Sequence, residues 1–248
     1  MDEETGQFWD HSKLTVVAGS NRVEGPLVDN SPVKASISKV FIPKEYQPID
    51  PKTNTHKNKE DILADIAVIQ LNENLWKFLK PAKISTLKLP KFNPQKQYNG
   101  EAKVIGFGAW AALPIFSFDN TYKFEFKIDG LLRHANVDLL DKATCNKRLN
   151  PRSTNTRIIC GRIKPNAGDE DGPLQRGTCQ GDSGGPLVKG NTVIGVVSFG
   201  SKYCDDKNHP SIYTKVSAYI PFIMNAVKNV ETVNMNVWPK NRPSVSKV

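Results

Sequence analysis

The stretch Thr178-Cys179-Gln180-Gly181-Asp182-Ser183-Gly184-Gly185-Pro186-Leu187 decides the fold. Two apolar runs follow its central serine, Pro186–Val188 and Thr192–Phe199, and Lys189-Gly190-Asn191 separates them. Two such runs around a glycine-containing turn predict a β-hairpin. Ser183 therefore leads into strands and not into a helix.

The rest of the 248-residue chain has the same character, because short apolar or alternating runs are separated by turn residues. We expect further strands at Leu14–Ala18, Val33–Ser38, Ile66–Leu71, Lys103–Gly106, Leu132–Leu140, Arg157–Ile163 and Ile212–Val216. Ile66–Leu71 is almost continuously apolar, which predicts a strand covered on both faces. Many short strands favour a β-sandwich or a β-barrel.

Helices are few in this prediction. Ser217 is a candidate cap for a helix with Ile220, Ile223, Val227 and Val230 on one face, and Asp141 for a shorter one ending at Leu149. The longest run without a charged residue is Val104–Phe118, 15 residues with two glycines and a proline. A spanning helix needs about 20 apolar residues, so we expect no membrane span.

Composition excludes several classes of protein. With 38% hydrophobic and 24% charged residues the chain is typical of a globular protein. Its net charge of +9 comes from scattered residues without an arginine-rich arm, so we expect no nucleic-acid partner, although weak attraction to acidic polymers or anionic membranes stays open. The cysteines lack the close pairs of a zinc site, and we expect no metal and no cofactor.

Gly181–Gly185 formally matches the G-x-S-x-G nucleophile elbow, but that motif requires a helix after the serine, where this chain predicts strands. The longer stretch instead resembles the nucleophile segment of the chymotrypsin/trypsin-like serine proteases. Segments resembling other parts of that family follow in the family's order: Ala64–Leu71, Val104–Gly108, Ile158–Gly161, Ser198–Gly200 and Pro210–Val216.

This resemblance covers about Leu14 to Val230 and implies an all-β fold of two antiparallel six-stranded barrels with a short C-terminal helix. Within a protease domain over residues 1–230, we expect an incomplete first barrel over 14–90 with a linker to about 100. The second barrel and the helix would occupy 101–230, and 231–248 would be a polar, disordered tail.

The resemblance also implies a catalytic machinery. A serine hydroxyl attacks peptide carbonyls only when an imidazole takes its proton and a carboxylate orients that imidazole. By resemblance Ser183 is the nucleophile and Asp65 the orienting acid, while the N–H groups of Gly181 and Ser183 form the oxyanion hole. Asp182 corresponds to the carboxylate that pairs with the new N-terminal ammonium group after zymogen cleavage.

Substrate binding is implied at three further places. Gly177 corresponds to the base of the specificity pocket, and Gly200 and Ser211 to its walls. None of them is acidic, so the resemblance implies a neutral or apolar side chain before the cleaved bond rather than Arg or Lys. Ser198, Phe199 and Gly200 would pair with the substrate backbone. Of the three pairings that four cysteines permit, the resemblance implies Cys145–Cys160 and Cys179–Cys204.

The family's histidine has no counterpart in its expected context. It would stand just before the strand at Leu14, in a segment resembling Ala-Ala-His-Cys, and neither His11 nor His56 has that context. We interpret these two, and His134 and His209, as surface or structural residues. The absence of one contiguous block leads us to expect an upstream coding segment and a secreted full-length product.

Two functions from different classes remain open. The first is a serine endopeptidase whose 248 residues are inactive by themselves, with Asp182 unpaired, the loops around 161–183 and 199–209 zymogen-like and the oxyanion hole poorly formed. The second is a non-catalytic homologue with a binding or regulatory role. We expect a monomer that meets protein or peptide substrates and protease inhibitors. The loop Ala109–Phe118 would either fold over the first barrel, which we favour, or bind a partner.

Overall fold

The computed structural model divides the chain into two compact units, each described here by itself. The first comprises residues 1–20, 27–86 and 221–248, and the second residues 21–26 and 87–220. The structure describes residues 14–23, 32–46, 64–75, 84–116, 122–149, 156–164, 177–201, 204, 209–230 and 235–238.

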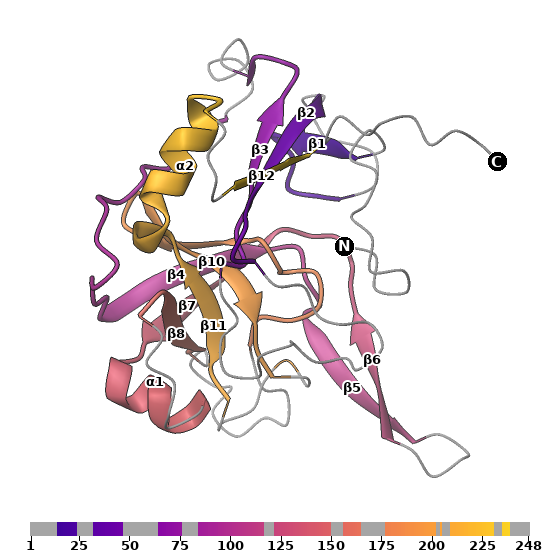
Figure 1. Cartoon of the computed structure of the whole chain (residues 1–248). Helices are drawn as coiled ribbons and strands as arrows, with labels where there is room; N and C mark the ends of the chain where they lie inside the picture. Colours follow the sequence, from indigo (N-terminus) through magenta and orange to yellow (C-terminus); the bar gives the residue numbers. More distant parts are fainter. Residues whose placement is uncertain are drawn as a thin grey trace, which may run out of the picture. The chain divides into compact units, whose positions relative to one another are not determined.

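Six antiparallel strands close a barrel in the second unit (Figure 1). Their order around the barrel is β10-β11-β8-β7-β4-β9. The bounds are β4 Gly100–Gly106, β7 Arg133–Leu139, β8 Ile158–Ile163, β9 Pro186–Lys189, β10 Thr192–Phe199 and β11 Ser211–Lys215. This closed barrel confirms the all-β prediction for this half of the chain.

Alternating side chains fill the barrel. In β4, Ala102 and Val104 are buried while Glu101 and Lys103 are exposed, as a two-residue period requires. The core also holds Val137, Leu139, Ile159, Leu187, Ile194, Val197 and Tyr213. Two glycines make room for these side chains, because a Cβ on Gly161 would lie 2.3 Å from the Val137 Cγ1 and one on Gly195 3.0 Å from the Tyr213 Cβ.

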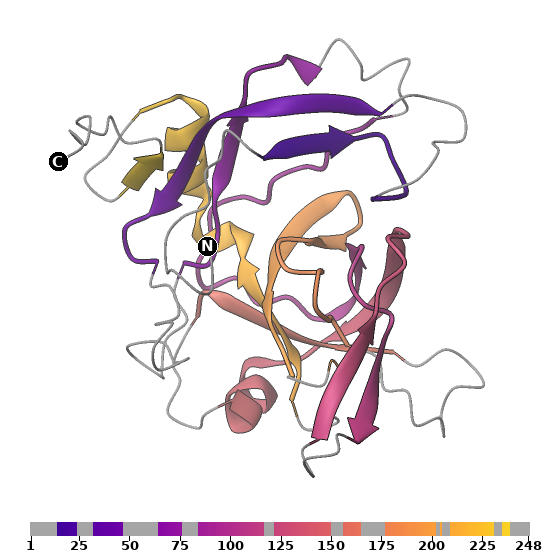
Figure 2. The same ribbon diagram turned by 90° about the vertical axis from the view of Figure 1, so that its right-hand side faces the viewer.

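Of the two described hairpins of this unit, the sequence predicts one and misses the other. The β9–β10 hairpin is confirmed, and Gly190 in its turn has φ +60. The segment expected as a loop after Gly108 is instead a second hairpin, β5 Ala111–Phe116 with β6 Tyr122–Lys127 (Figure 2). Ala112 and Phe126 pack against the buried Cys179 and Cys204, so the hairpin's base packs on its own unit.

The described strands of the first unit form an open sheet in the order β1-β2-β12, with β3 also paired to β2. Their bounds are β1 Thr15–Ala18, β2 Val33–Pro43, β3 Val68–Leu71 and β12 Met235–Trp238. An open sheet is what an incomplete first barrel predicts.

Two expectations about this sheet are wrong. The disordered tail expected over 231–248 does not hold at Met235–Trp238, which pairs with Val40–Pro43 of β2, and the rest of the tail lies outside the described residues. Ile69 in β3 is 48% exposed, although its run predicted burial on both faces. Among the described strands β3 pairs only with β2, so it is an edge strand there.

Both predicted helices exist. In α1, Lys142–Leu149, the Asp141 carboxylate accepts hydrogen bonds from the Thr144 N–H and hydroxyl, which confirms Asp141 as the N-cap. The C-terminal helix α2, Ile220–Val227, ends before Val230. Ser217 does not cap it: Ser217 lies in a 3₁₀ turn, and its hydroxyl donates to the Asn93 carbonyl.

Candidate active site

Ser183 lies on a tight turn between the disulfide at Cys179 and strand β9. The Asp182 N–H donates to the Cys179 carbonyl and the Gly185 N–H to the Asp182 carbonyl, at 3.0 and 2.8 Å. The Gly184 N–H donates to the carbonyl of Val197 in β10, and the Val197 N–H donates back to Gly185. The turn is therefore held both by itself and by the barrel wall.

The backbone N–H groups of Gly181 and Ser183 are available as donors in this turn. Within the described part of the chain, the N–H groups of Gly181 and Ser183 donate no hydrogen bond, and both residues are exposed. Gly181 has φ +94, and a Cβ there would lie 3.1 Å from the Gly108 Cα. Both the backbone conformation and the space require glycine at 181. The turn can therefore offer two donors to an incoming oxygen.

The Asp182 side chain turns away from Ser183 toward strand β4. Its Oδ1 accepts a hydrogen bond from the Gly108 N–H and its Oδ2 one from the Cys179 N–H, each at 2.9 Å. These two backbone donors replace the water that burial removes from the carboxylate. The loops expected to be zymogen-like lie largely outside the described residues, at 165–176, 202–203 and 205–208.

Two glycines make room for this carboxylate. A Cβ on Gly106 would lie 2.0 Å from the Asp182 Oδ1, and a Cβ on Gly108 would lie 2.5 Å from its Cγ. Both distances are far below any real contact, so no other residue fits at 106 or 108 without moving Asp182. The glycines that the sequence shows after strand β4 thus have a steric reason.

Both predicted disulfides are confirmed. Cys145–Cys160 joins α1 to β8, and Cys179–Cys204 ties the Ser183 turn to a residue 25 positions later. Closing loops of 15 and 25 residues stabilises the folded chain by about 3 kcal/mol each in the chain-entropy description. The second disulfide limits how far the Ser183 turn can move.

The residues predicted for the pocket walls lie together. A Cβ on Gly200 would contact the Thr178 hydroxyl at 3.6 Å and the Ser211 Cα at 3.7 Å. The buried Thr178 hydroxyl donates to the Ser211 hydroxyl oxygen at 2.9 Å. Gly177, half-buried, directly precedes Thr178. Thr178 was missed as a wall residue, because nothing in the motif indicates that its side chain turns toward Ser211.

A buried phenol lies two residues beyond Ser211. Tyr213 is 0% exposed, and its hydroxyl has no hydrogen-bond partner among the described residues. Burial raises the pKa of this phenol, so it stays neutral. The hydroxyls near the predicted pocket, on Thr178, Ser211 and Tyr213, are all uncharged.

The strand end that would receive a substrate backbone is irregular. The register between β10 and β11 shifts between Val197 and Phe199, so Ser198 occupies a bulge. Phe199 pairs with Ile212 and packs near the Cys145–Cys160 disulfide. Ser198 and Phe199 thus end β10, and Gly200 follows the strand toward the predicted pocket walls.

Asp65 belongs to the first unit. It follows Ala64, a buried non-glycine residue with φ +60, and the Ile66 N–H closes a turn onto the Ala64 carbonyl at 2.7 Å. Burial raises the pKa of Tyr46, and the negative charge of Asp65 raises it further, so the two side chains are near each other. The strained turn fixes the half-buried Asp65 just before β3.

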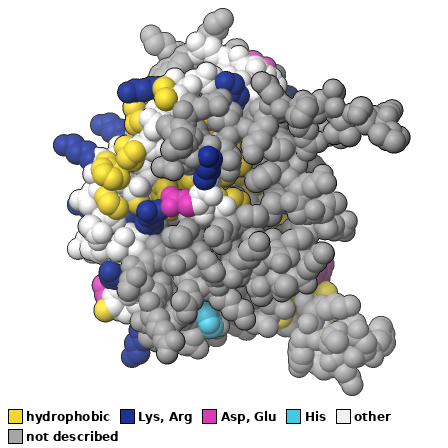
Figure 3. Space-filling model, in the orientation of Figure 1, with side chains coloured by type: hydrophobic (Ala, Val, Ile, Leu, Met, Phe, Trp, Pro, Cys, Tyr) yellow, Lys and Arg dark blue, Asp and Glu magenta, His cyan; other side chains and the backbone are white. Residues whose placement is uncertain are grey.

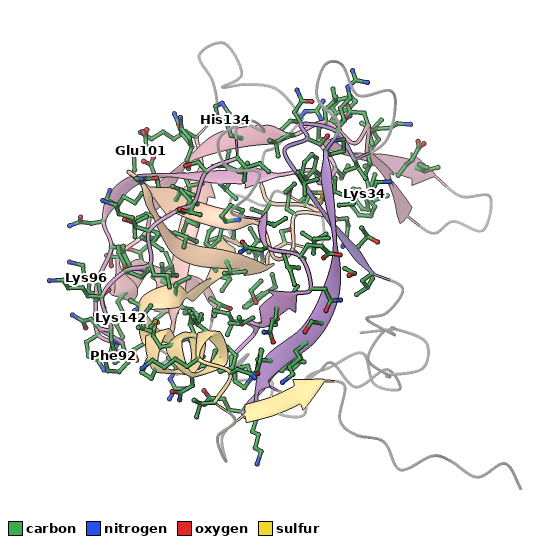
Figure 4. The ribbon with its side chains drawn as sticks, turned by 90° about the horizontal axis from the view of Figure 1, so that it is seen from above. Lys34, Phe92, Lys96, Glu101, His134 and Lys142 are labelled. Carbon is green, nitrogen blue, oxygen red and sulfur yellow. A yellow bond between two sulfur atoms is a disulfide. The ribbon has the colours of Figure 1, made fainter. Side chains whose placement is uncertain are left out.

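The histidines divide into two pairs. His134 in β7 (Figure 4) is exposed, and so is His209, as predicted for surface residues. His11 and His56, together with most of the predicted polar loop at 47–61, lie outside the described residues. No described histidine is buried.

The comparison with protein families decides the assignment. The sequence model of the trypsin family, described as "Trypsin", matches residues 10–223. The chain belongs to the trypsin family. Its all-β fold is also that of mouse neuropsin, a serine protease: the TM-score is 0.58 at 22% identity, covering 86% of this chain and 78% of neuropsin.

Relatives of this trypsin-family chain include several serine proteases. It is 33% identical over 66% of its length to the thrombin-like enzyme cerastocytin of Cerastes cerastes, and 29% identical over 62% to human kallikrein-15. It covers 54% and 57% of those two proteins, little more than half of their lengths. It is 29% identical over 77% of its length to rat submandibular glandular kallikrein-3, of which it covers 88%.

None of the described helices is long and apolar enough to cross a membrane. No group of three or more His, Cys, Asp or Glu side chains in the described ranges could hold a metal ion.

Proposed function

We propose that this trypsin-family chain carries the nucleophile half of a serine endopeptidase that works through an acyl-enzyme. Ser183 is the nucleophile, and Asp65 orients the imidazole that deprotonates it. As the tetrahedral intermediate forms, the N–H groups of Gly181 and Ser183 stabilise the oxygen that becomes negative. Each such donor contributes about 3–4 kcal/mol of transition-state stabilisation.

One observation carries this proposal: the N–H groups of Gly181 and Ser183, on either side of Asp182, donate no hydrogen bond within the described residues, while those of Asp182, Gly184 and Gly185 are bound. Asp182 accepts from Gly108 and Cys179, and the disulfide at Cys179 holds the start of the turn. Donors fixed in this way need not reorganise when charge develops, which is the physical basis of oxyanion stabilisation.

The sequence has no histidine in the motif in which the family carries its general base. Without an imidazole, turnover in triad hydrolases falls by about a millionfold. We therefore propose that the 248 residues by themselves are inactive, and that a histidine encoded upstream completes the triad. The alternative is a non-catalytic homologue with a binding or regulatory role, which the missing histidine favours.

A fluorophosphonate probe tests the nucleophile. We expect the folded 248-residue chain to remain unlabelled. A longer protein that includes an upstream segment resembling Ala-Ala-His-Cys, found by sequencing the 5′ end of the transcript, should label at Ser183. The Ser183→Ala variant of that longer protein is the control and should not label. A transcript without such a segment, or a folded longer protein that stays unlabelled, supports the non-catalytic alternative.

The specificity pocket is proposed at Gly177, Gly200 and Ser211, with Thr178 as an additional wall residue. Because the hydroxyls gathered there are uncharged, we expect cleavage after neutral or apolar side chains. A peptide library presented to the longer, active protein checks this. A strong preference for Arg or Lys would show that a carboxylate reaches the pocket from elsewhere.

The two disulfides indicate the compartment in which the proposed enzyme works. Two disulfides persist in oxidising compartments, so we propose a secreted protein. Its partners would be protein or peptide substrates and protease inhibitors, and we propose that it acts as a monomer.

A further inference from the structure

A pocket of the second unit lies beside the Cys145–Cys160 disulfide, where α1, β8 and β11 meet. Counting the solvent at its mouth, it has a volume of about 380 Å³. Its lining includes three lysines, Lys96, Lys142 and Lys215, and no aspartate or glutamate. A cluster of like charges without a carboxylate is costly unless an anion completes it.

Lys215 forms the buried part of this pocket. This last residue of β11 is 3% exposed, and its Nζ donates to the carbonyls of Pro94 and Thr156. An ammonium group has three N–H donors, and both acceptors are neutral, so a full positive charge stays uncompensated. Burial, together with a smaller effect of the Lys142 charge, lowers the pKa of Lys215 to about 8.

Lys96 and Lys142 form the outer part of the pocket. Figure 4 shows them on neighbouring segments at one edge of the unit, and both line the pocket. Both are exposed, and within the described residues neither side chain makes an ion pair or a hydrogen bond. The adjacent carboxylate, Asp141, is occupied by Thr144 at the start of α1.

A fourth polar side chain lines the same wall. Asn146 lies four residues after Lys142, on the same face of α1, and contributes an amide donor to the pocket. Donors therefore approach from α1, from the 96–98 segment and from β11. This arrangement suits a tetrahedral group with three or four oxygens better than a planar carboxylate with two.

We propose that this pocket binds a tetrahedral oxyanion, a sulfate or phosphate group, between the ammonium groups of Lys96 and Lys142, above the buried Lys215. The described Lys and Arg side chains on the face in Figure 3 are spread out rather than gathered. On that face the described residues form no broad basic surface. It is independent of the Ser183 chemistry.

Amide chemical shifts of the folded 248-residue chain test the proposal. Sodium sulfate and sodium phosphate are titrated against sodium chloride at equal ionic strength, because chloride reports general screening. We expect saturable shifts at Gln97, Tyr98 and Asn146 with sulfate or phosphate and none with chloride. A third titration uses glucose 6-sulfate. Tighter binding of this sugar ester than of free sulfate indicates a sugar-borne group, and tighter binding of free sulfate indicates the ion.

Two charge-matched variants separate the pocket from general attraction. Lys142→Gln should weaken binding at least fivefold. Lys147→Gln removes the same charge from the same helix but lies outside the pocket lining, so it should bind within twofold of the unmodified chain. The proposal is overturned if the shifts do not saturate, or if the two variants bind equally.

Discussion

Asp182 shows how much one side chain of the candidate site depends on residues that lie far away in sequence. Its two oxygens are bound by the N–H groups of Gly108 and Cys179, 74 and 3 residues away. Its space comes from the missing side chains of Gly106 and Gly108. The carboxylate, the disulfide and the β4–β5 connection therefore act together to hold the turn that carries Ser183.

At this scale we predict that Gly106→Ala lowers the free energy of unfolding by about 2–3 kcal/mol, since the new methyl group would overlap the Asp182 carboxylate at 2.0 Å. Gly200→Ala is the control, because its methyl group meets nothing closer than 3.6 Å, and it should change stability by less than about 1 kcal/mol. Urea unfolding measures both. Equal stability of the two variants would mean that Asp182 is not held where the structure places it.

Among the elements, β12 pairs with a strand that lies far from it in the sequence. It lies more than 190 residues after β2, yet pairs with the end of β2 from Val40 to Pro43. The same segment of β2 pairs with β3 along its other edge. Phe41, 0% exposed, clusters there with Ala226 of α2, so the C-terminal elements complete the first unit.

We predict that a chain ending at Val230 loses protection against hydrogen exchange in β2. Among Val40–Ile42, the amides that donate to β12 should exchange faster, because their acceptors on that edge are gone. Those of Ala35 and Ser36, which pair with β1, should change little. A chain ending at Trp238 retains β12 and serves as the control. Unchanged exchange at Val40–Ile42 in the shorter chain would contradict the pairing.

Over the whole molecule, the covalent cross-links are unevenly distributed. Both disulfides, and so all four cysteines, belong to the second unit, while the first unit depends on strand pairing and on the small cluster around Phe41. The candidate nucleophile, its proposed oxyanion donors and the lysine pocket also lie in the cross-linked unit. Its stability therefore depends on redox conditions.

We predict that replacing Cys145 and Cys160 together by alanine costs about 2–5 kcal/mol, because the unfolded chain regains the freedom of the 15-residue loop. Hydrogen exchange should accelerate in β8 and β11. The amides of β2 should be unaffected. A variant in which Cys179 and Cys204 are replaced should also leave exchange in β2 unchanged. Equal acceleration in β2 would show that the two units unfold as one.

The sequence by itself determined what depends on local patterns. Strand alternation identified β4, β7, β8 and β11 to within a few residues, Gly190 marked the hairpin turn, and Asp141 marked the start of α1. The motif around Ser183 indicated the family, and with it both disulfides. Such features are predictable because periodicity, caps and turns act over a few neighbouring residues.

Only the tertiary structure decided what depends on partners distant in sequence. Nothing in Met235–Trp238 indicates that β2 offers a free edge, and nothing in Lys215 indicates that its ammonium group meets two carbonyls instead of a carboxylate. The loop after Gly108 became a hairpin for the same reason, because its pairing partner lies beyond a turn without a clear signal. Pairing and burial depend on which surfaces the folded chain brings together, and a local pattern does not contain that information.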